Sequence, residues 1–114
     1  MKAEFVELPA FERHREQYLD DAGYLELQVE LMRNPEAGGV IRGTGGLRKV
    51  RFADSRRGKG KRGGLRVIHY WWNAGPQFWL FAIYDKDEMA DLTPAQSKAL
   101  KPMLKAELEA RRQK

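Results

Sequence analysis

Two apolar segments separated by a short polar break constrain the fold of this chain more than any other feature. Residues 65–73 and 77–85 are rich in Val, Ile, Leu and aromatic residues, and the Gly75-Pro76 pair between them predicts a turn. The second segment is apolar at both odd and even positions, which is typical of a strand covered on both faces. The sequence therefore predicts a β-hairpin whose second strand is a central strand of a sheet.

Further strands and helices flank this hairpin. β-Favouring residues predict strands over 4–8 and 47–53, and apolar residues at helical spacing predict a helix over 9–19. A capping box that begins at Thr93 predicts the start of a C-terminal helix. Because Pro102 cannot donate a helix hydrogen bond, we expect that helix to kink or to restart there.

Residues 24–32 fit either a strand or a helix. Their apolar residues alternate as in a strand, but Leu27 and Leu31 also share one helical face. Asp20 or Asp21 can cap such a helix, so local periodicity leaves both interpretations open.

Taken in order, these elements predict a single α+β domain over residues 1–114, with helices packed on one face of a mostly antiparallel sheet. The glycine-rich stretch 36–46 is expected to be a loop. Residues 55–64 contain no apolar side chain and are expected to form the mobile tip of a long hairpin.

The composition excludes several classes of functional site. The chain has no cysteine, which rules out a disulfide framework, a thiol nucleophile and thiolate metal sites. His14 and His69 are its only histidines, so we expect neither a histidine-rich metal site nor a cofactor. No stretch approaches the ~20 apolar residues of a transmembrane helix, and the N-terminus lacks the apolar core of a signal peptide. These features predict a cytoplasmic protein with no membrane partner.

Positive charge is concentrated in one part of the chain. The net charge is +5, yet residues 42–66 alone hold ten Lys and Arg and a single acid, Asp54. The rest of the chain carries a net negative charge. Since clustered cations attract phosphate polyanions, this window predicts a nucleic-acid-binding surface. A solvated loop that only keeps the protein soluble is the alternative.

Three stretches are distinctive: GGVIRGTGGLRKVRFAD at 38–54, GGLRVIHYWW at 63–72 and YDKDEMADLTPAQ at 84–96. Together they resemble the RelE/HigB family of toxins from bacterial type II toxin–antitoxin modules, and the HigB-like branch most closely. The similarity extends over nearly the whole chain. It implies a small α+β fold with a helical hairpin after the first strand, and hence a helix over 24–32.

The resemblance also implies a function and partners. Members of this family enter the ribosomal A site and cleave the mRNA codon there, which stops translation. A cognate antitoxin, commonly a helix-turn-helix DNA-binding protein, neutralises the toxin, and the toxin reaches operator DNA only through that complex. By resemblance, we expect a metal-independent endoribonuclease that acts on mRNA in the ribosome.

Lys49, Arg51 and Arg66 are the candidate catalytic residues. Strand alternation directs Lys49 and Arg51 to one face, and Arg66 begins the next strand across the hairpin. Cations that converge on one phosphate can stabilise the charge that develops when a ribose 2′-OH attacks it. The resemblance places catalytic basic residues of the family at these positions and a further one at Lys86. Some members carry a tyrosine near the last helix, but none stands around Leu92, so the proton-transfer group stays open.

Other residues are candidates for RNA binding. Tyr70 shares a face with Arg66 and can either stack on a base or pack beneath a helix. The remaining candidates are basic side chains of the cationic window: Arg42, Arg48, Arg56, Arg57, Lys59, Lys61 and Arg62.

Several other residues have simpler explanations. Alternation places His69 on the face opposite Arg66, which favours a packed or hydrogen-bonded histidine over an acid–base catalyst. His14 is expected on the apolar side of the first helix. The acids between Asp85 and Asp91 precede a helix, where the backbone dipole favours negative charge.

Two other functions are open at this point. A ParE-like gyrase poison shares the fold but lacks the cationic site, so the basic cluster argues against it. A non-catalytic RNA-binding module binds RNA in a salt-dependent way without cleaving it.

Overall fold

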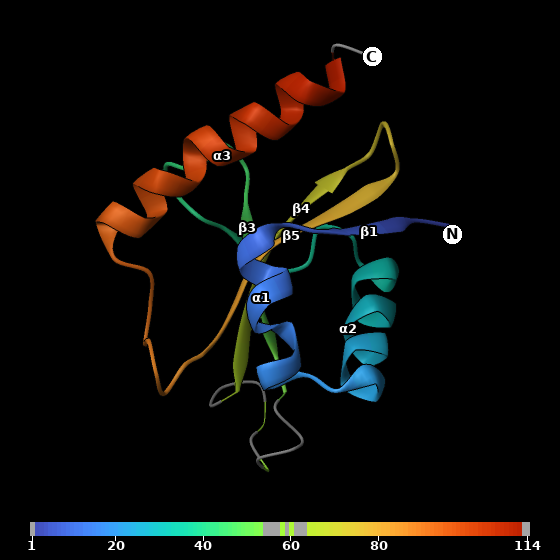
Figure 1. The fold of residues 1–114 in the computed structure, drawn as a ribbon, viewed down its shortest axis with the longest axis vertical. Helices are drawn as coiled ribbons and strands as arrows, with labels where there is room; N and C mark the ends of the chain where they lie inside the picture. Colours follow the sequence, from blue (N-terminus) through green and yellow to red (C-terminus); the bar gives the residue numbers. More distant parts are fainter. Residues whose placement is uncertain (1, 54–57, 59, 61–63, 113–114) are drawn as a thin grey trace.

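A computed structural model describes residues 2–53, 58, 60 and 64–112 (Figure 1). The elements in chain order are β1 (Glu4–Glu7), α1 (Pro9–Tyr18), α2 (Asp21–Arg33), β2 (Gly39–Val40), β3 (Arg48–Phe52), β4 (Leu65–Trp72), β5 (Gln77–Asp85) and α3 (Pro94–Arg112). The five strands form one sheet in the order β1-β5-β4-β3-β2, which is antiparallel except where β1 lies beside β5. This is the predicted α+β architecture. Most of the expected hairpin tip at 55–64 lies outside the described residues.

The predicted hairpin is β4–β5. Strand β5 is buried along most of its length and lies between β1 and β4, which confirms it as an inner strand. The prediction of a loop over 36–46 was wrong in part, because strand β2 lies within it. Next to it, Gly38 has φ +88°, and a Cβ at this residue would lie 2.3 Å from the carbonyl oxygen of Lys49. A glycine is therefore needed where this turn approaches β3.

The ambiguous segment 24–32 is helical. The side chain of Asp20 accepts a hydrogen bond from the backbone N–H of Gly23 at 2.8 Å and caps α2. Leu27 and Leu31, one helical turn apart, are both buried. This apolar stripe packs against the sheet, and that contact favours the helix over the strand, a choice that local periodicity left open.

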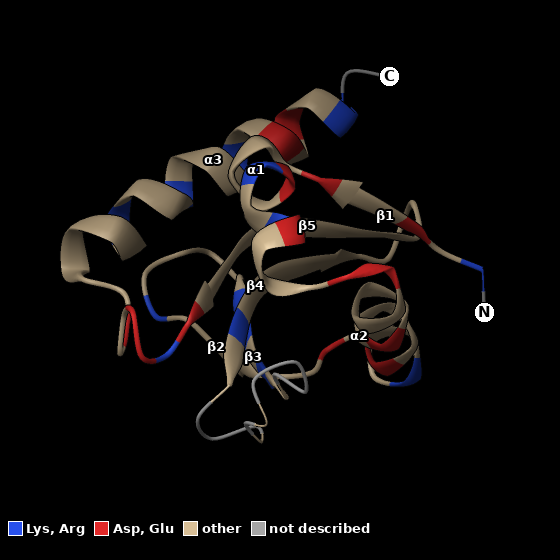
Figure 2. Ribbon diagram, turned by 60° about the horizontal axis from the view of Figure 1, so that its bottom comes forward, with Lys and Arg blue, Asp and Glu red and all other residues tan. Residues whose placement is uncertain are grey.

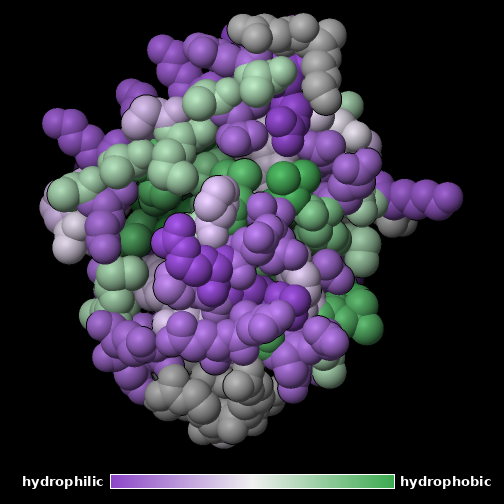
Figure 3. All heavy atoms as spheres, viewed as in Figure 1, coloured by the Kyte–Doolittle hydropathy of each residue, from purple (hydrophilic) through white to green (hydrophobic). Residues whose placement is uncertain are grey.

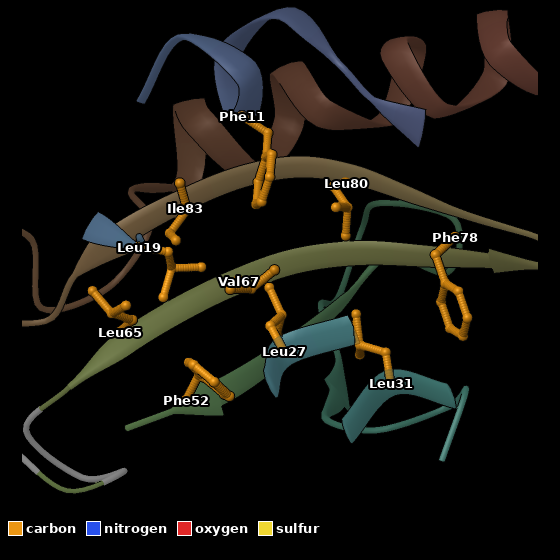
Figure 4. Close-up of a cluster of buried hydrophobic side chains, with 10 residues drawn as sticks. All are labelled: Phe11, Leu19, Leu27, Leu31, Phe52, Leu65, Val67, Phe78, Leu80 and Ile83. Carbon is orange, nitrogen blue, oxygen red and sulfur yellow. The ribbon is translucent and has the colours of Figure 1, made fainter. Parts of the chain in front are cut away.

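The helices cover both faces of the sheet, whereas the sequence predicted one face. One hydrophobic cluster joins Phe11 of α1 and Leu27 of α2 to strand residues that include Val67 (Figure 4). A second cluster joins Leu104 of α3 to other strand residues, among them Ile68. Because consecutive residues of a strand point to opposite faces, neighbours in β4 serve different clusters. We call these two sides the α1/α2 face and the α3 face.

A β-bulge in β5 changes which residues lie on each face. Ile68 and His69 are consecutive in β4, but their partners in β5 are Ala82 and Leu80, so Phe81 is left unpaired. Beyond this extra residue the alternation of β5 is shifted by one position. The C-terminal half of β5 therefore presents different residues to each face than a simple count along the sequence gives.

Helix α3 begins with the predicted capping box. The backbone N–H of Gln96 donates to Thr93 Oγ1 at 3.1 Å, and the N–H of Thr93 donates to Gln96 Oε1 at 2.8 Å. The helix continues through Pro102 rather than restarting there. Pro102 is exposed, while Leu104 in the same turn is buried and holds the helix against the sheet.

Apolar surface is visible alongside α3 when the molecule is viewed as in Figure 1, whereas polar residues cover most of the lower half of this view (Figure 3). None of the described helices is long and apolar enough to cross a membrane.

The burial of α3 gives a stability prediction. Leu104 is 2% exposed, so Leu104→Ala should lower the free energy of unfolding by about 2–5 kcal/mol because it leaves a cavity. The neighbouring Met103 is 40% exposed, and Met103→Ala should change the free energy of unfolding by no more than about 0.5 kcal/mol. Urea denaturation measures both, and equal effects would contradict the placement of this helix.

Candidate active site

The basic residues of β3 and β4 meet on the α3 face of the sheet. Lys49 pairs with Ile68 of the second cluster, and Arg51 pairs with Arg66. Arg66 in turn lies opposite Tyr84 of β5. Arg51, Arg66 and Tyr84 therefore form a row across three adjacent strands, and Figure 2 shows the cationic stretch on β3.

Two arginines lie directly opposite each other in this row. Arg51 is exposed, whereas Arg66 is only 5% exposed, and its Nη1 donates to the carbonyl oxygen of Leu65 at 3.2 Å. Like charges on directly opposed residues of a sheet destabilise each other, and burying a cation costs solvation energy. An anion bound beside the exposed Arg51 relieves the repulsion between the two like charges.

An open cavity of about 450 Å³ lies beside this row. Its lining includes Arg42, Lys49, Arg51, Asp91, Leu92 and Ser97. The cavity is thus bounded by β2, β3 and the segment that leads into α3. Among the described residues, no group of three or more His, Asp and Glu side chains is placed to hold a metal ion.

Asp91 belongs to this cavity, although the sequence predicted only a helix-dipole role for it. Its Oδ1 forms an ion pair with Lys49 Nζ at 2.8 Å and accepts the backbone N–H of Leu92 at 2.8 Å. The hydrogen bond from Lys49 is the main reason that the pKa of Asp91 lies below its ordinary value. No acid lies in the first turn of α3, so the dipole explanation was wrong for this residue.

Tyr84 is the second residue that sequence reasoning missed. It is 6% exposed, and its hydroxyl has no hydrogen-bond partner among the described residues. Burial raises the pKa of this phenol, the negative charge of Asp91 raises it further, and the charge of Arg66 opposes the rise. The phenol therefore stays protonated at neutral pH, close enough to Asp91 and Arg66 for both charges to act on it.

The loop between β5 and α3 is fixed by its own acidic residues. Tyr18 Oη of α1 donates to Glu88 Oε1 at 2.8 Å, although the two residues are 70 positions apart. The carboxylate of Asp85, which is fully buried, accepts the backbone N–H of Asp87 at 2.8 Å. These bonds position the loop that carries Asp91.

Four of the predicted site residues that the structure describes are not in the lining of the cavity: Arg48, Arg66, Tyr70 and Lys86. Lys86 is exposed at the end of β5 and is not part of the lining. Arg48 alternates onto the α1/α2 face, where it donates to the carbonyl of Gly38 at 3.0 Å and pairs with Glu36 at 3.2 Å. Its charge is engaged in holding the turn before β2.

Of the predicted RNA-binding residues, Arg42 lines the cavity and is exposed. Tyr70 lies on the α3 face as expected, and it is half-buried against the ring of Trp79 at a centroid distance of 5.3 Å. The other five lie outside the described residues: Arg56, Arg57, Lys59, Lys61 and Arg62.

The histidines give one confirmation and one correction. His69 is fully buried opposite the site, its Nε2 lies 2.9 Å from the carbonyl oxygen of Ala37, and burial lowers its pKa. His14 is exposed, so its predicted place on the apolar side of α1 was wrong. The buried stripe of α1 runs instead through Phe11 and the half-buried Tyr18.

Solved structures similar to this chain are toxins. A double arginine-to-alanine mutant of Escherichia coli RelE in the free state matches with a TM-score of 0.50 and 14% identity, over 79% of this chain and 90% of that one. The isolated E. coli RelE toxin matches with a TM-score of 0.50 and 15% identity, over 88% and 97% of the two chains. The chain has a RelE-like fold. No protein-family model matches the sequence.

The RelE-like fold confirms the resemblance in architecture and its implied helical hairpin after the first strand. At this identity the match is one of fold, and it assigns no role to the residues of the site.

The Lys49–Asp91 pair predicts a change in a measurable pKa. In the wild type, the pKa of Asp91 should lie below its ordinary value, and Lys49→Met should raise it because the main hydrogen bond to the carboxylate is lost. Lys86→Met, which removes an exposed charge from the same loop, should change it little. Carbon-detected NMR titration of the carboxyl group measures all three proteins.

The same shift sets a pH window for stability. Since the carboxyl is more acidic when folded, the pair stabilises the protein above the unfolded pKa of ~3.9, and this contribution is lost as pH falls through the lower folded pKa. The gain should be small because Asp91 is exposed. An identical pKa in Lys49→Met and wild type would contradict the ion pair.

Proposed function

We propose that this protein is the toxin of a type II toxin–antitoxin module and that it cleaves mRNA on the ribosome without a metal ion. The observation that carries the proposal is the row of Arg51, Arg66 and Tyr84 beside the Lys49–Asp91 pair. Arg51, Lys49 and Asp91 line an open cavity there. These residues supply cations for a phosphate, a protonated phenol and an ionised carboxylate.

The cations hold the scissile phosphate. Arg66 is buried beside the site and offers a planar fork of donors that suits two phosphoryl oxygens. Arg51 and Lys49 approach from the neighbouring strand. Charge accumulates on the phosphoryl oxygens as the 2′-oxygen attacks, so preorganised cations bind the transition state more tightly than the substrate.

Asp91 and Tyr84 complete the proton transfers. Asp91 takes the proton of the 2′-OH while the 2′-oxygen forms its bond to phosphorus. The bond from phosphorus to the 5′-oxygen breaks, and Tyr84 gives its proton to that oxygen. The products are a 2′,3′-cyclic phosphate and a 5′-hydroxyl, and exchange with water restores both residues.

Substrate entry makes Asp91 a better base. In the free protein Lys49 is bonded to Asp91 and lowers the pKa of its carboxyl. A bound phosphate competes for the Lys49 ammonium and releases the carboxylate beside the ribose. Loss of that hydrogen bond raises the basicity of Asp91 at the moment when a base is needed.

The partners follow from the same proposal. They are mRNA and the ribosome, a cognate helix-turn-helix antitoxin, and operator DNA only through the toxin–antitoxin complex. The resemblance of 38–54, 63–72 and 84–96 to RelE/HigB toxins supports this assignment. The proposal also includes that the protein is a single domain that acts in the cytoplasm. Lys86, for which the resemblance implies a catalytic role, does not line the cavity, and we propose instead that it contacts RNA near the end of β5.

The cleavage proposal is tested by brief induction in cells. Primer extension on an abundant translated message should show cuts, and an untranslated copy of that message should show none. Arg66→Ala should lower cleavage by about 10²–10³-fold because it removes stabilisation of the developing charge. Arg51→Ala should weaken cleavage as well, and because Arg51 is exposed its loss leaves folding intact.

Other outcomes of this experiment would favour a different site or a different function. Folded Arg66→Ala and Arg51→Ala variants that cut as well as wild type would overturn the assigned site. Growth arrest with both messages uncut would favour a gyrase-type inhibitor. Salt-sensitive RNA binding with neither arrest nor cuts would favour a non-catalytic RNA-binding module.

Tyr84→Phe tests the proton donor with a matched control. It removes one oxygen from a residue whose hydroxyl has no partner among the described residues, so the fold should keep its stability. Cleavage on programmed ribosomes in a single turnover should fall roughly a hundredfold or more. Tyr70→Phe, on the same face but packed on Trp79, should retain near wild-type cleavage. Equal rates for the two variants would remove Tyr84 from the mechanism.

A further inference from the structure

A second cavity continues from the first toward α3. It has a volume of about 370 Å³ and is lined by Arg42, Gly43, Leu92, Pro94, Ser97 and Lys98. Arg42, Leu92 and Ser97 also line the first cavity. Because three residues are shared, the two hollows form one continuous groove from the reactive row to the first turns of α3.

The groove is cationic over its whole length. Arg51 and Lys49 lie in the first cavity, Arg42 lies at the junction, and Lys98 lies in the second cavity. Among the described residues, Asp91 is the one acid that lines either cavity, and it is already paired with Lys49. An alternation of positive charge with the apolar Leu92 suits a chain in which phosphates alternate with sugars and bases.

One wall of the second cavity is a rigid turn. The buried hydroxyl of Thr44 donates to the carbonyl of Ile41 at 2.6 Å and accepts the N–H of Leu47 at 3.2 Å. The N–H of Ile41 also donates to the carbonyl of Leu47 at 2.8 Å. These bonds close the turn at both ends, so the backbone that carries Arg42 is held in place before any ligand arrives.

The opposite wall is the start of α3, but the helix terminus itself is not the anion site. Pro94 has no N–H, and the N–H of Gln96 is taken by Thr93 Oγ1 at 3.1 Å. The cations of this cavity are the side chains of Arg42 and Lys98, which line it from separate elements.

We infer that the second cavity is a phosphate subsite for the same RNA strand that is cut in the first. Arg42 and Lys98 bind a backbone phosphate that flanks the scissile one, and Leu92 contacts the sugar or base between the two phosphates. This inference rests on the proposed function and extends it: Lys98 helps to set the register of the strand and takes no part in the chemistry.

The test uses the full-length protein and RNA in which every 2′-OH is methylated, so that no strand can be cut. A dinucleotide has one backbone phosphate, and the matching trinucleotide has one more. Amide NMR titrations should show that the dinucleotide shifts signals around Lys49 and Arg51. The trinucleotide should bind about fivefold more tightly and also shift Ser97 and Lys98.

Three variants locate the extra phosphate. Lys98→Ala and Arg42→Ala should each abolish the gain from dinucleotide to trinucleotide. Lys105→Ala removes the same charge from an exposed position two turns further along α3, which lines neither cavity, and should keep the gain. Retention of the full gain in Lys98→Ala, or an equal loss in Lys105→Ala, would overturn the subsite.

The readout separates this inference from the function on which it rests. If the dinucleotide binds at Lys49 and Arg51 but the longer strand gains nothing, the subsite fails and the proposed cleavage site stands. If the dinucleotide shifts no signal around Lys49 and Arg51, the proposed cleavage site fails together with the subsite.

Discussion

The unpaired Phe81 in β5 is the constraint on which the site depends. A strand that is buried on both faces has a strict alternation, and one extra residue exchanges the faces for everything beyond it. Ile83 consequently fills the core on the α1/α2 face, and Tyr84 lies on the α3 face opposite Arg66. Without the bulge, an apolar residue would stand beside the buried arginine and the phenol would lie in the opposite core.

Charge balance explains the rest of the arrangement. The site gathers Lys49, Arg51 and Arg66 on one patch of sheet, where like charges repel one another. Asp91 offsets part of that repulsion by its bond to Lys49. A long-range hydrogen bond from Tyr18 to Glu88 helps to hold the loop that brings this carboxylate in. Under the proposed function, this acid occupies the place at Lys49 that a bound phosphate would take.

The helices cover the two faces of the sheet to different extents. Helices α1 and α2 cover one face with a cluster of buried apolar side chains, and this cluster stabilises the fold. Helix α3 covers only part of the other face, anchored by Leu104, and leaves the cations of β3 open beside its N-terminal end. The cations therefore lie on the opposite side of the sheet from the α1/α2 cluster.

The sequence by itself determined the features that depend on neighbouring residues. These are the β4–β5 hairpin, the capping box of α3, the opposed faces of Arg66 and His69, and the shared face of Lys49 and Arg51, because turns, caps and alternation act over a few residues. Tertiary structure alone decided that the helices cover both faces, that α3 continues through Pro102, and that Tyr84 and Asp91 join the site. Those outcomes depend on a bulge set by pairing with β4 and on contacts between distant segments, which no local pattern encodes.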